Sequence, residues 1–198
     1  MKKVTIIGSK GFIGSNLSKY FKNLGVKVQS VNNLKNLKKN KFENIFYCIG
    51  VTGDFIKRPY DTVEAHISLL NKIIHKVKFK KLIYLSSTRI YQQAKTTVED
   101  SDFSFNITSN IDLYNSSKLF GETLCLSKKN KNIKIARISN VIGQYKNKDN
   151  FFSNILHQSQ KGKIIIDGPQ NFKRDFISID DVCYLLDKIC FNGKSRLY

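Results

Sequence analysis

The chain has 198 residues, 41% apolar and 25% charged, an ordinary balance that excludes disordered and fibrous proteins. No apolar run approaches the roughly 18 residues that cross a bilayer, and no secretion signal opens the chain, so we expect a cytoplasmic protein with no membrane partner. The formal net charge of +19 is extreme, and such a basic excess can indicate nucleic acid, an acidic membrane surface or an anionic substrate.

Lysine accounts for this charge, supplying 29 of the 34 basic residues. The lysines are scattered over loops and expected helix ends, without the interleaved aromatic residues that stack on bases. We therefore expect no nucleic-acid partner and keep a basic nucleic-acid-binding module only as a third hypothesis. The four cysteines form no CxxC pair and the three histidines show no metal-ligand spacing, so no metal site is predicted.

The first quarter of the chain predicts the start of a parallel sheet. Residues 3–7 are a short β-branched run that stops at Gly8, and residues 12–24 repeat apolar side chains at helical spacing. Alternating residues predict a second strand over 26–31. The continuous apolar run 45–49 predicts a strand covered on both faces.

The alternation of helix and strand continues to the end of the chain. Apolar spacing predicts helices over 63–77, 112–126 and 182–189, with strands over 81–86 and 133–138. This βαβ order predicts an α/β fold with a doubly wound parallel sheet of the Rossmann type. The polar stretch 92–110 has the length of a functional loop.

We expect three segments in this fold. Residues 1–143 form the dinucleotide-binding domain, 144–178 a small and incomplete substrate lobe, and 179–198 a helix that returns to the first domain. A new strand is expected to begin after Lys194, so the chain stops where relatives of this fold continue.

Three glycines lie between the first strand and the first helix. Gly8, Gly11 and Gly14 allow a tight turn and a close approach of a pyrophosphate to the backbone amides. The free N–H groups at the start of the helix, at Phe12 and Ile13, would face that anion. The first gap is one residue longer than in the usual dinucleotide fingerprint, so a turn needed only for packing stays an alternative.

The end of the second strand carries Asn32 where NAD-binding folds place an acidic residue. A carboxylate there would bind the ribose hydroxyls of NAD and repel a 2′-phosphate. Because it is absent, and because Lys35, Lys38 and Lys39 follow, the sequence predicts NAD or NADP as cofactor.

Tyr114 and Lys118 are one helical turn apart on one face. A phenol titrates near 10, and a close cation favours its phenolate, so this spacing suits proton transfer near neutrality. Taken alone, the pair fits a solvated helix surface better than a catalytic role. Hydroxyls at Ser86 and Ser87 end the fourth strand, at the sheet edge where ligands of doubly wound folds bind.

Taken in order, these signals resemble the extended short-chain dehydrogenase/reductases that act on nucleotide sugars. The motifs are G-x-x-G-x-x-G after the first strand, S-S-x-x-I-Y at residues 86–91 and Y-x-x-x-K at 114–118. The resemblance continues through A-R-I-S-N-V-I-G at 136–143 and R-D-F-I-S-I-D-D-V at 174–182. It covers residues 3–183.

The resemblance implies roles for individual residues. Tyr114 would be the acid/base, Lys118 would hold the nicotinamide ribose and lower the pKa of the phenol, and Ser87 would bind the reacting sugar oxygen. The implied cofactor contacts are Gly8, Gly11, Phe12, Ile13, Gly14, Asn32, Cys48, Ile49, Gly50 and Lys118. The implied substrate contacts are Ser87, Thr88, Asn140 and Arg174.

Two of the motif positions have structural alternatives. Arg174 would contact the substrate's diphosphate, or instead pair with Asp175 or Asp181. For Asp180 and Asp181 we expect a cap at the start of the last helix rather than a role in the site.

One departure from the family narrows the range of expected reactions. Members that dehydrate sugars at C4 and C6 carry an Asp-Glu pair after the catalytic hydroxyl, where this chain has Thr88 and Arg89. The sequence therefore predicts an NAD(P)-dependent epimerase or keto-reductase of a nucleotide sugar, in surface polysaccharide biosynthesis. The alternative is a non-catalytic nucleotide-binding protein that has lost the substrate lobe.

The resemblance also implies a homodimer. Many relatives pair through the helices that correspond to 63–77 and 112–126, with Ile67, Ile74, Leu119 and Leu126 as candidate apolar contacts. Packing within one chain is the alternative role for these side chains.

Overall fold

Five parallel strands form the central sheet of the computed structural model, which describes residues 2–32, 41–51, 53–106, 108–127, 130–143, 151–166 and 173–198. The strands are β1 (Lys3–Ile7), β2 (Lys27–Val31), β3 (Lys41–Tyr47), β4 (Lys78–Ser87) and β5 (Ile133–Ile138). Their order is β2-β1-β3-β4-β5, so the direction of winding reverses between β1 and β3. Ligands of open α/β sheets bind at this reversal.

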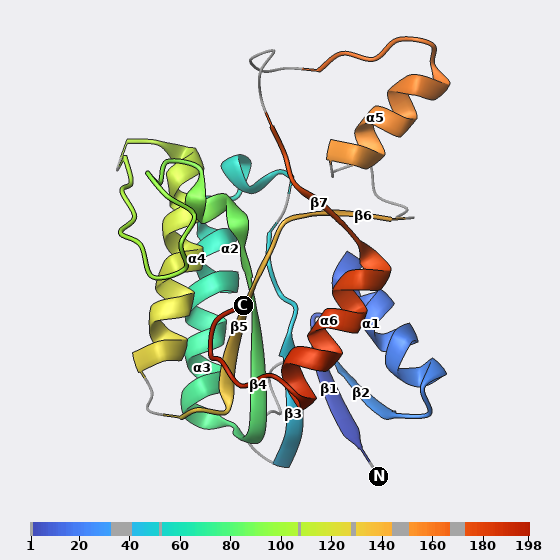
Figure 1. Ribbon diagram of the computed structural model, residues 1–198, viewed down its shortest axis with the longest axis vertical. Helices are drawn as coiled ribbons and strands as arrows, with labels where there is room; N and C mark the ends of the chain where they lie inside the picture. Colours follow the sequence, from blue (N-terminus) through green and yellow to red (C-terminus); the bar gives the residue numbers. More distant parts are fainter. Residues whose placement is uncertain are drawn as a thin grey trace.

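Helices cover both faces of the sheet (Figure 1). On one face lie α1 (Phe12–Asn23) and α6 (Ile179–Phe191), and on the other lie α2 (Pro59–Val63), the π-helical turn η3 (Glu64–Ser68), α3 (Leu69–Lys76) and α4 (Asn110–Ser127). The predicted doubly wound α/β fold is confirmed.

Successive residues of one strand supply both apolar layers. In β3, Phe46 packs with α1 and α6, whereas Tyr47 belongs to the layer under α3 and α4. In β4, Ile83 and Tyr84 divide in the same way. This explains the continuous apolar runs, because a parallel strand buried on both faces has no polar side.

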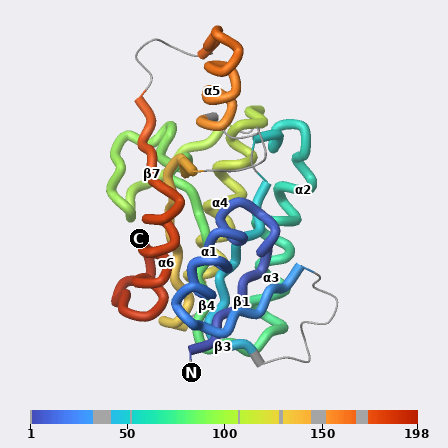
Figure 2. Tube along the Cα trace, turned by 90° about the vertical axis from the view of Figure 1, so that its right-hand side faces the viewer, coloured from blue at the N-terminus to red at the C-terminus, as the bar shows by residue number. Residues whose placement is uncertain are grey.

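The remaining elements lie at the carboxyl edge of the sheet. Short helices η2 (Phe55–Lys57) and η4 (Thr88–Tyr91) follow β3 and β4. Strands β6 (Asn140–Ile142) and β7 (Phe176–Ser178) form a separate parallel pair. Helix α5 (Phe151–Gln160) stands above this edge (Figures 1 and 2). The predicted substrate lobe, 144–178, is described only over 151–166 and 173–178, and its boundaries stay a prediction.

The predicted strands at 3–7 and 133–138 have the bounds of β1 and β5, but several other elements start earlier than expected, among them β3 and the helix before β4. Strand β3 begins at Lys41 because polar residues can pair in its first half: the side-chain amide of Asn44 donates to the carbonyl of Lys3 at 2.8 Å. The helix expected over 63–77 begins at Pro59, which suits the first turn of a helix.

Where a strand was expected after Lys194, the end of the chain forms an isolated β-bridge between Leu197 and Ile135. Residues 196–198 run parallel to β5, with the Ile135 amide donating to Arg196 at 2.8 Å and the Tyr198 amide donating to Ile135 at 3.0 Å. In the described part of the chain, no helix is both long and apolar enough to cross a membrane.

Candidate active site

A cavity of about 500 Å³ opens at the carboxyl edge of the sheet, between the start of α1, the ends of β3 and β4, and the strand pair β6–β7. Most of the predicted site residues line it: Gly11, Phe12, Ile13, Cys48, Ile49, Gly50, Ser87, Thr88, Tyr114, Lys118, Asn140 and Arg174. Gly8, Gly14 and Asn32 do not line the cavity. Gly8 and Gly14 shape the glycine loop, and Asn32 contacts it.

The glycine loop has the geometry of an anion cradle. Gly8 has φ of +86°, a conformation that side chains disfavour, and a Cβ on Gly14 would lie 2.3 Å from the Gly8 carbonyl oxygen. Gly11 is the N-cap of α1 and has no capping side chain, and the first turn contains no acidic residue. The amides that open α1 are therefore available to a phosphate group, so this loop fits the pyrophosphate of a dinucleotide.

Asn32 holds the end of β2 against the loop. Its side-chain oxygen accepts a hydrogen bond from the hydroxyl of Ser9 at 3.0 Å. Lys35, Lys38 and Lys39, which bear on the choice between NAD and NADP, lie outside the described residues.

Tyr114 and Ser87 meet on the cavity wall. The Ser87 hydroxyl lies beside the phenol of Tyr114, and its oxygen accepts from the Arg89 amide at 3.2 Å as the N-cap of η4. The Tyr114 ring packs on Phe55, with 4.8 Å between ring centroids. The serine and the phenol are thus fixed relative to each other before any ligand enters.

The electrostatics of Tyr114 differ from the sequence expectation. Burial raises the pKa of the phenol, and the groups that oppose this are the Arg89 guanidinium and the Ser87 hydroxyl, not Lys118. The reason lies in the direction of the lysine, whose Nζ donates to the Leu85 carbonyl at 2.9 Å. In this structure Arg89 is the cation that favours the phenolate.

Lys118 itself is almost completely buried. Burial lowers its pKa to about 8, while Glu122 and Cys48 act in the opposite direction. Its hydrogen bond to Leu85 fixes it beside the end of β4. Helix α4 and strand β4 therefore hold the predicted catalytic residues together.

His66, one of the three histidines that show no metal-ligand spacing in the sequence, is fully buried in the structure. Its Nδ1 lies 2.8 Å from the Ser117 hydroxyl, which donates its proton to the Tyr114 carbonyl. Nδ1 must therefore be the donor, which leaves Nε2 as a lone-pair acceptor. Nε2 has no hydrogen-bond partner among the described residues, and both it and Lys118 Nζ face the Cα of Gly50.

The turn η3, which carries His66, is π-helical, a form often found at functional sites. Burial, together with the smaller effect of the Lys118 charge, lowers the pKa of His66 to about 2. No spacing pattern in the sequence marks this residue, because its position depends on how α3 packs on α4.

The predicted substrate contacts lie on the far side of the cavity. Asn140 pairs with Phe176 between β6 and β7, and its side-chain amide donates to the Asp175 carbonyl at 3.0 Å. Thr88 and Arg174 also line the cavity. Ser178 rather than an aspartate caps α6, accepting from the Asp181 amide at 3.0 Å, so Asp180 and Asp181 lie in the first turn.

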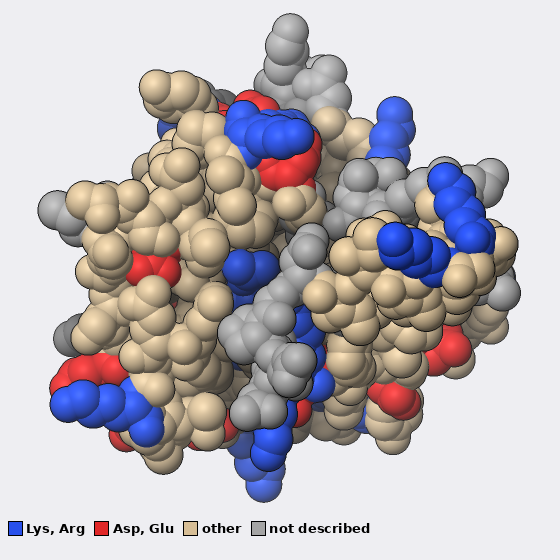
Figure 3. Space-filling view, turned by 90° about the horizontal axis from the view of Figure 1, so that it is seen from above, with Lys and Arg blue, Asp and Glu red and all other residues tan. Residues whose placement is uncertain are grey.

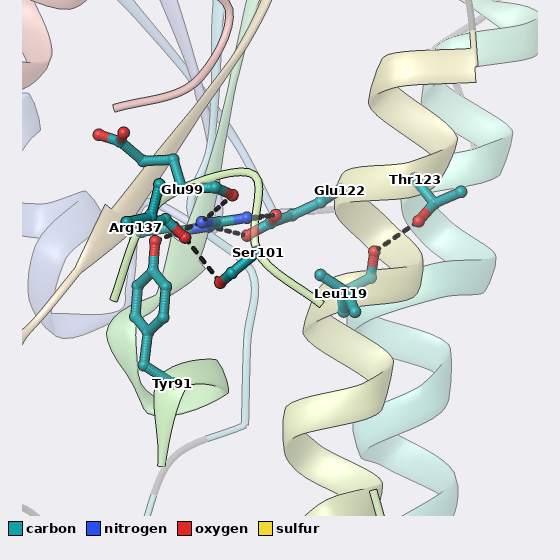
Figure 4. Close-up of polar contacts among 8 residues, drawn as sticks. Tyr91, Glu99, Ser101, Leu119, Glu122, Thr123 and Arg137 are labelled. Carbon is teal, nitrogen blue, oxygen red and sulfur yellow. Dashed lines mark hydrogen bonds and ion pairs between the residues drawn. The ribbon is translucent and has the colours of Figure 1, made fainter. Parts of the chain in front are cut away.

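A buried ion pair holds the long loop that precedes α4 (Figure 4). The guanidinium of Arg137 on β5 contacts the Glu122 carboxylate at 2.8 Å, bonds the Tyr91 hydroxyl, and donates to the Glu99 carbonyl at 2.8 Å. Both charged side chains are at least 95% buried. Arg137, at the start of the motif that contains Asn140, thus has a structural role.

The structure corrects part of the predicted dimer contact. Ile74 of α3 points into the core, so its predicted place in a dimer contact is wrong, whereas Leu126 is exposed and the neighbouring Phe120 is 62% exposed.

Figure 3 looks onto the carboxyl edge of the sheet, where the described Lys and Arg side chains stand in separate groups, several beside acidic residues. The described residues contain no cluster of His, Cys, Asp and Glu suited to a metal ion.

Comparison with known proteins identifies the class. Residues 4–196 match the family described as NAD dependent epimerase/dehydratase, which confirms the resemblance seen in the sequence. The chain is 28% identical over 232 residues to an ADP-L-glycero-D-manno-heptose-6-epimerase of Brachyspira hyodysenteriae, covering 90% of this chain and 69% of that protein.

Two solved structures show the same fold. UDP-glucuronic acid 4-epimerase from Bacillus cereus, in complex with NAD, is 21% identical with a TM-score of 0.83, covering 98% of this chain and 76% of its own. RMD from Pseudomonas aeruginosa, complexed with NADPH, is 18% identical with a TM-score of 0.76, covering 100% and 76%. The predicted cofactor, NAD or NADP, agrees with the cofactors of these complexes.

Proposed function

This chain belongs to the NAD-dependent epimerase/dehydratase family, and we propose that it uses NAD or NADP to epimerise or reduce a nucleotide sugar in surface polysaccharide biosynthesis. One observation carries the proposal. Ser87 and Tyr114 lie together on the wall of one cavity, which the start of α1 and the buried Lys118 also line.

Each residue has a distinct part in this chemistry. The Tyr114 phenolate would take the proton of the sugar hydroxyl and the phenol would return it to the keto oxygen, while Ser87 would hold that oxygen. A bound nicotinamide supplies the hydride acceptor and donor. Lys118 is fixed by Leu85 within reach of the same cavity, where its ammonium can donate to a ribose hydroxyl.

The residues beside Tyr114 support epimerisation or reduction over dehydration. Thr88 and Arg89 line the cavity directly after Ser87, and neither supplies the carboxyl group needed for a second proton transfer. No aspartate or glutamate is found among the described residues of the cavity wall.

Cofactor titration followed by turnover assays tests the proposal. NAD and NADP are titrated by calorimetry, and turnover is measured on UDP- and dTDP-sugars. Tyr114→Phe removes only the phenolic oxygen, so we expect turnover to fall by about 100- to 10,000-fold with cofactor affinity nearly unchanged. Lys118→Ala should impair both.

Two outcomes would contradict the proposal. Near-normal turnover of Tyr114→Phe would remove the assigned acid/base. Tight dinucleotide binding without turnover on any sugar would favour the non-catalytic nucleotide-binding protein instead.

A further inference from the structure

Arg89 places its guanidinium on the cavity wall beside Tyr114. Its guanidinium carbon lies 5.0 Å from the centroid of the Phe55 ring and 5.4 Å from that of Tyr114. The Nε atom is buried and has no hydrogen-bond partner among the described residues. The ion pairs that the described residues form do not include Arg89.

The described residues around the cavity that Arg89 lines add positive charge and no negative charge. Lys118 and Arg174 line the same cavity, whose described lining contains no acidic residue. The pKa of Arg89 is lowered, first by burial and also by repulsion from Arg174, while Tyr114 acts in the opposite direction. A cation held under these conditions costs free energy that an anionic ligand group would offset.

We propose that Arg89 binds a carboxylate carried by the sugar, so that the substrate is the nucleotide derivative of a uronic acid. This inference rests on the proposed function. The planar fork of a guanidinium matches the two oxygens of a carboxylate, and hydrogen bonds to charged groups are stronger than neutral ones.

The position of Arg89 favours a carboxylate of the sugar over the diphosphate. Arg89 lies beside Tyr114, whose oxygen must reach the hydroxyl of the reacting carbon. In a hexuronic acid the carboxylate is attached to C5, next to C4, so it lies beside a reacting C4. The diphosphate is attached at C1, on the other side of the sugar ring, and a second guanidinium, that of Arg174, lines the cavity.

Paired ligands that differ only in the carboxylate provide the test. The intact, NAD-loaded chain is titrated by calorimetry with UDP-glucuronate and with UDP-glucose. A second pair, glucuronate 1-phosphate and glucose 1-phosphate, lacks the nucleobase. We expect the acidic member to bind about 10- to 100-fold more tightly, the range of a hydrogen-bonded charge. In Arg89→Gln this ratio should fall close to one, and in Arg89→Lys, which keeps the charge without the fork, it should be intermediate.

Arg58→Gln is the matched control, because it removes an exposed arginine outside the cavity and should keep the ratio. Equal binding of both members by the wild type would overturn the inference. So would an equal loss for both members in Arg89→Gln, which would assign Arg89 to the diphosphate. Binding of UDP-glucose without preference leaves the proposed function standing, whereas failure to bind any dinucleotide or nucleotide sugar counts against both.

Discussion

The ammonium of Lys118 donates to the carbonyl of Leu85 at 2.9 Å, two residues before Ser87 on the same strand. This bond joins α4 to the end of β4. Lys118 lines the cavity, yet it is not among the groups that shift the pKa of the Tyr114 phenol. A buried ammonium held by one carbonyl is a site where protonation and stability must be coupled.

The first prediction concerns this coupling. The pKa of Lys118 is about 8, whereas an unfolded lysine titrates near 10.4. Between these values the unfolded chain binds more protons, so this group makes the free energy of unfolding rise with pH. Urea unfolding should show the wild type gaining about 2 kcal/mol relative to Lys118→Met between pH 7.5 and 10.

Lys72→Met makes the same substitution at an exposed lysine paired with Glu64. It should follow the wild type over this pH range. Parallel pH profiles for wild type and Lys118→Met would show that the buried lysine keeps an ordinary affinity for its proton.

His66 gives a pH dependence of the same sign at lower pH. Its folded pKa of about 2 lies below the value near 6.5 of an unfolded histidine, so the unfolded chain takes up a proton first as the pH falls. Between pH 7 and 5 the wild type should lose about 2 kcal/mol of unfolding free energy relative to His66→Asn. Urea denaturation at the two pH values measures it. His75→Asn, at an exposed position of α3, should not reproduce the change.

Two glycines of the phosphate loop have different roles: Gly11 leaves space for a ligand, and Gly14 allows close packing. A Cβ on Gly11 meets only the Gly8 carbonyl oxygen, at 3.4 Å, so Gly11→Leu should fold while its side chain fills the cradle and abolishes dinucleotide binding. A Cβ on Gly14 would lie 2.3 Å from the same oxygen, so Gly14→Ala should cost about 1–3 kcal/mol of stability. Calorimetry and thermal unfolding measure the two effects. Normal NAD affinity in a folded Gly11→Leu variant would refute the loop assignment.

These local features show which part of the molecule sequence patterns can predict. The bounds of β1 and β5 followed from runs rich in apolar and β-branched residues, since strands buried on both faces are mostly apolar. The polar start of β3 was missed because its partners are backbone groups of neighbouring strands. Periodicity carries no information about such pairing.

In the candidate site, motif order was enough to bring Ser87 and Tyr114 together at the end of the sheet. The directions of the side chains were not predictable in the same way. Lys118 bonds Leu85 rather than acting on the phenol, and Arg89 takes that place. Both depend on packing between α4 and β4, which no spacing rule encodes. His66 was missed for the same reason.

The last prediction concerns the buried pair of Arg137 and Glu122, which ties the loop before α4 to the sheet. Arg137→Met would leave the Glu122 carboxylate buried without its partner, so we expect a loss of about 3–5 kcal/mol in unfolding free energy. The bonds from Arg137 to Tyr91 and Glu99 would also be lost. The loop should then open locally before the protein unfolds.

Trypsin reports on this opening through the exposed Lys95, which lies in the loop. Under native conditions the variant should be cut at Lys95 well before the wild type. Arg58→Met breaks an exposed ion pair with Asp61 and should cost at most about 1 kcal/mol, with the wild-type cleavage rate at Lys95. Equal cleavage of Arg137→Met and wild type would mean that the loop is held by its other contacts, among them the bonds from Gln93 and the Asn106 amide to Asp112.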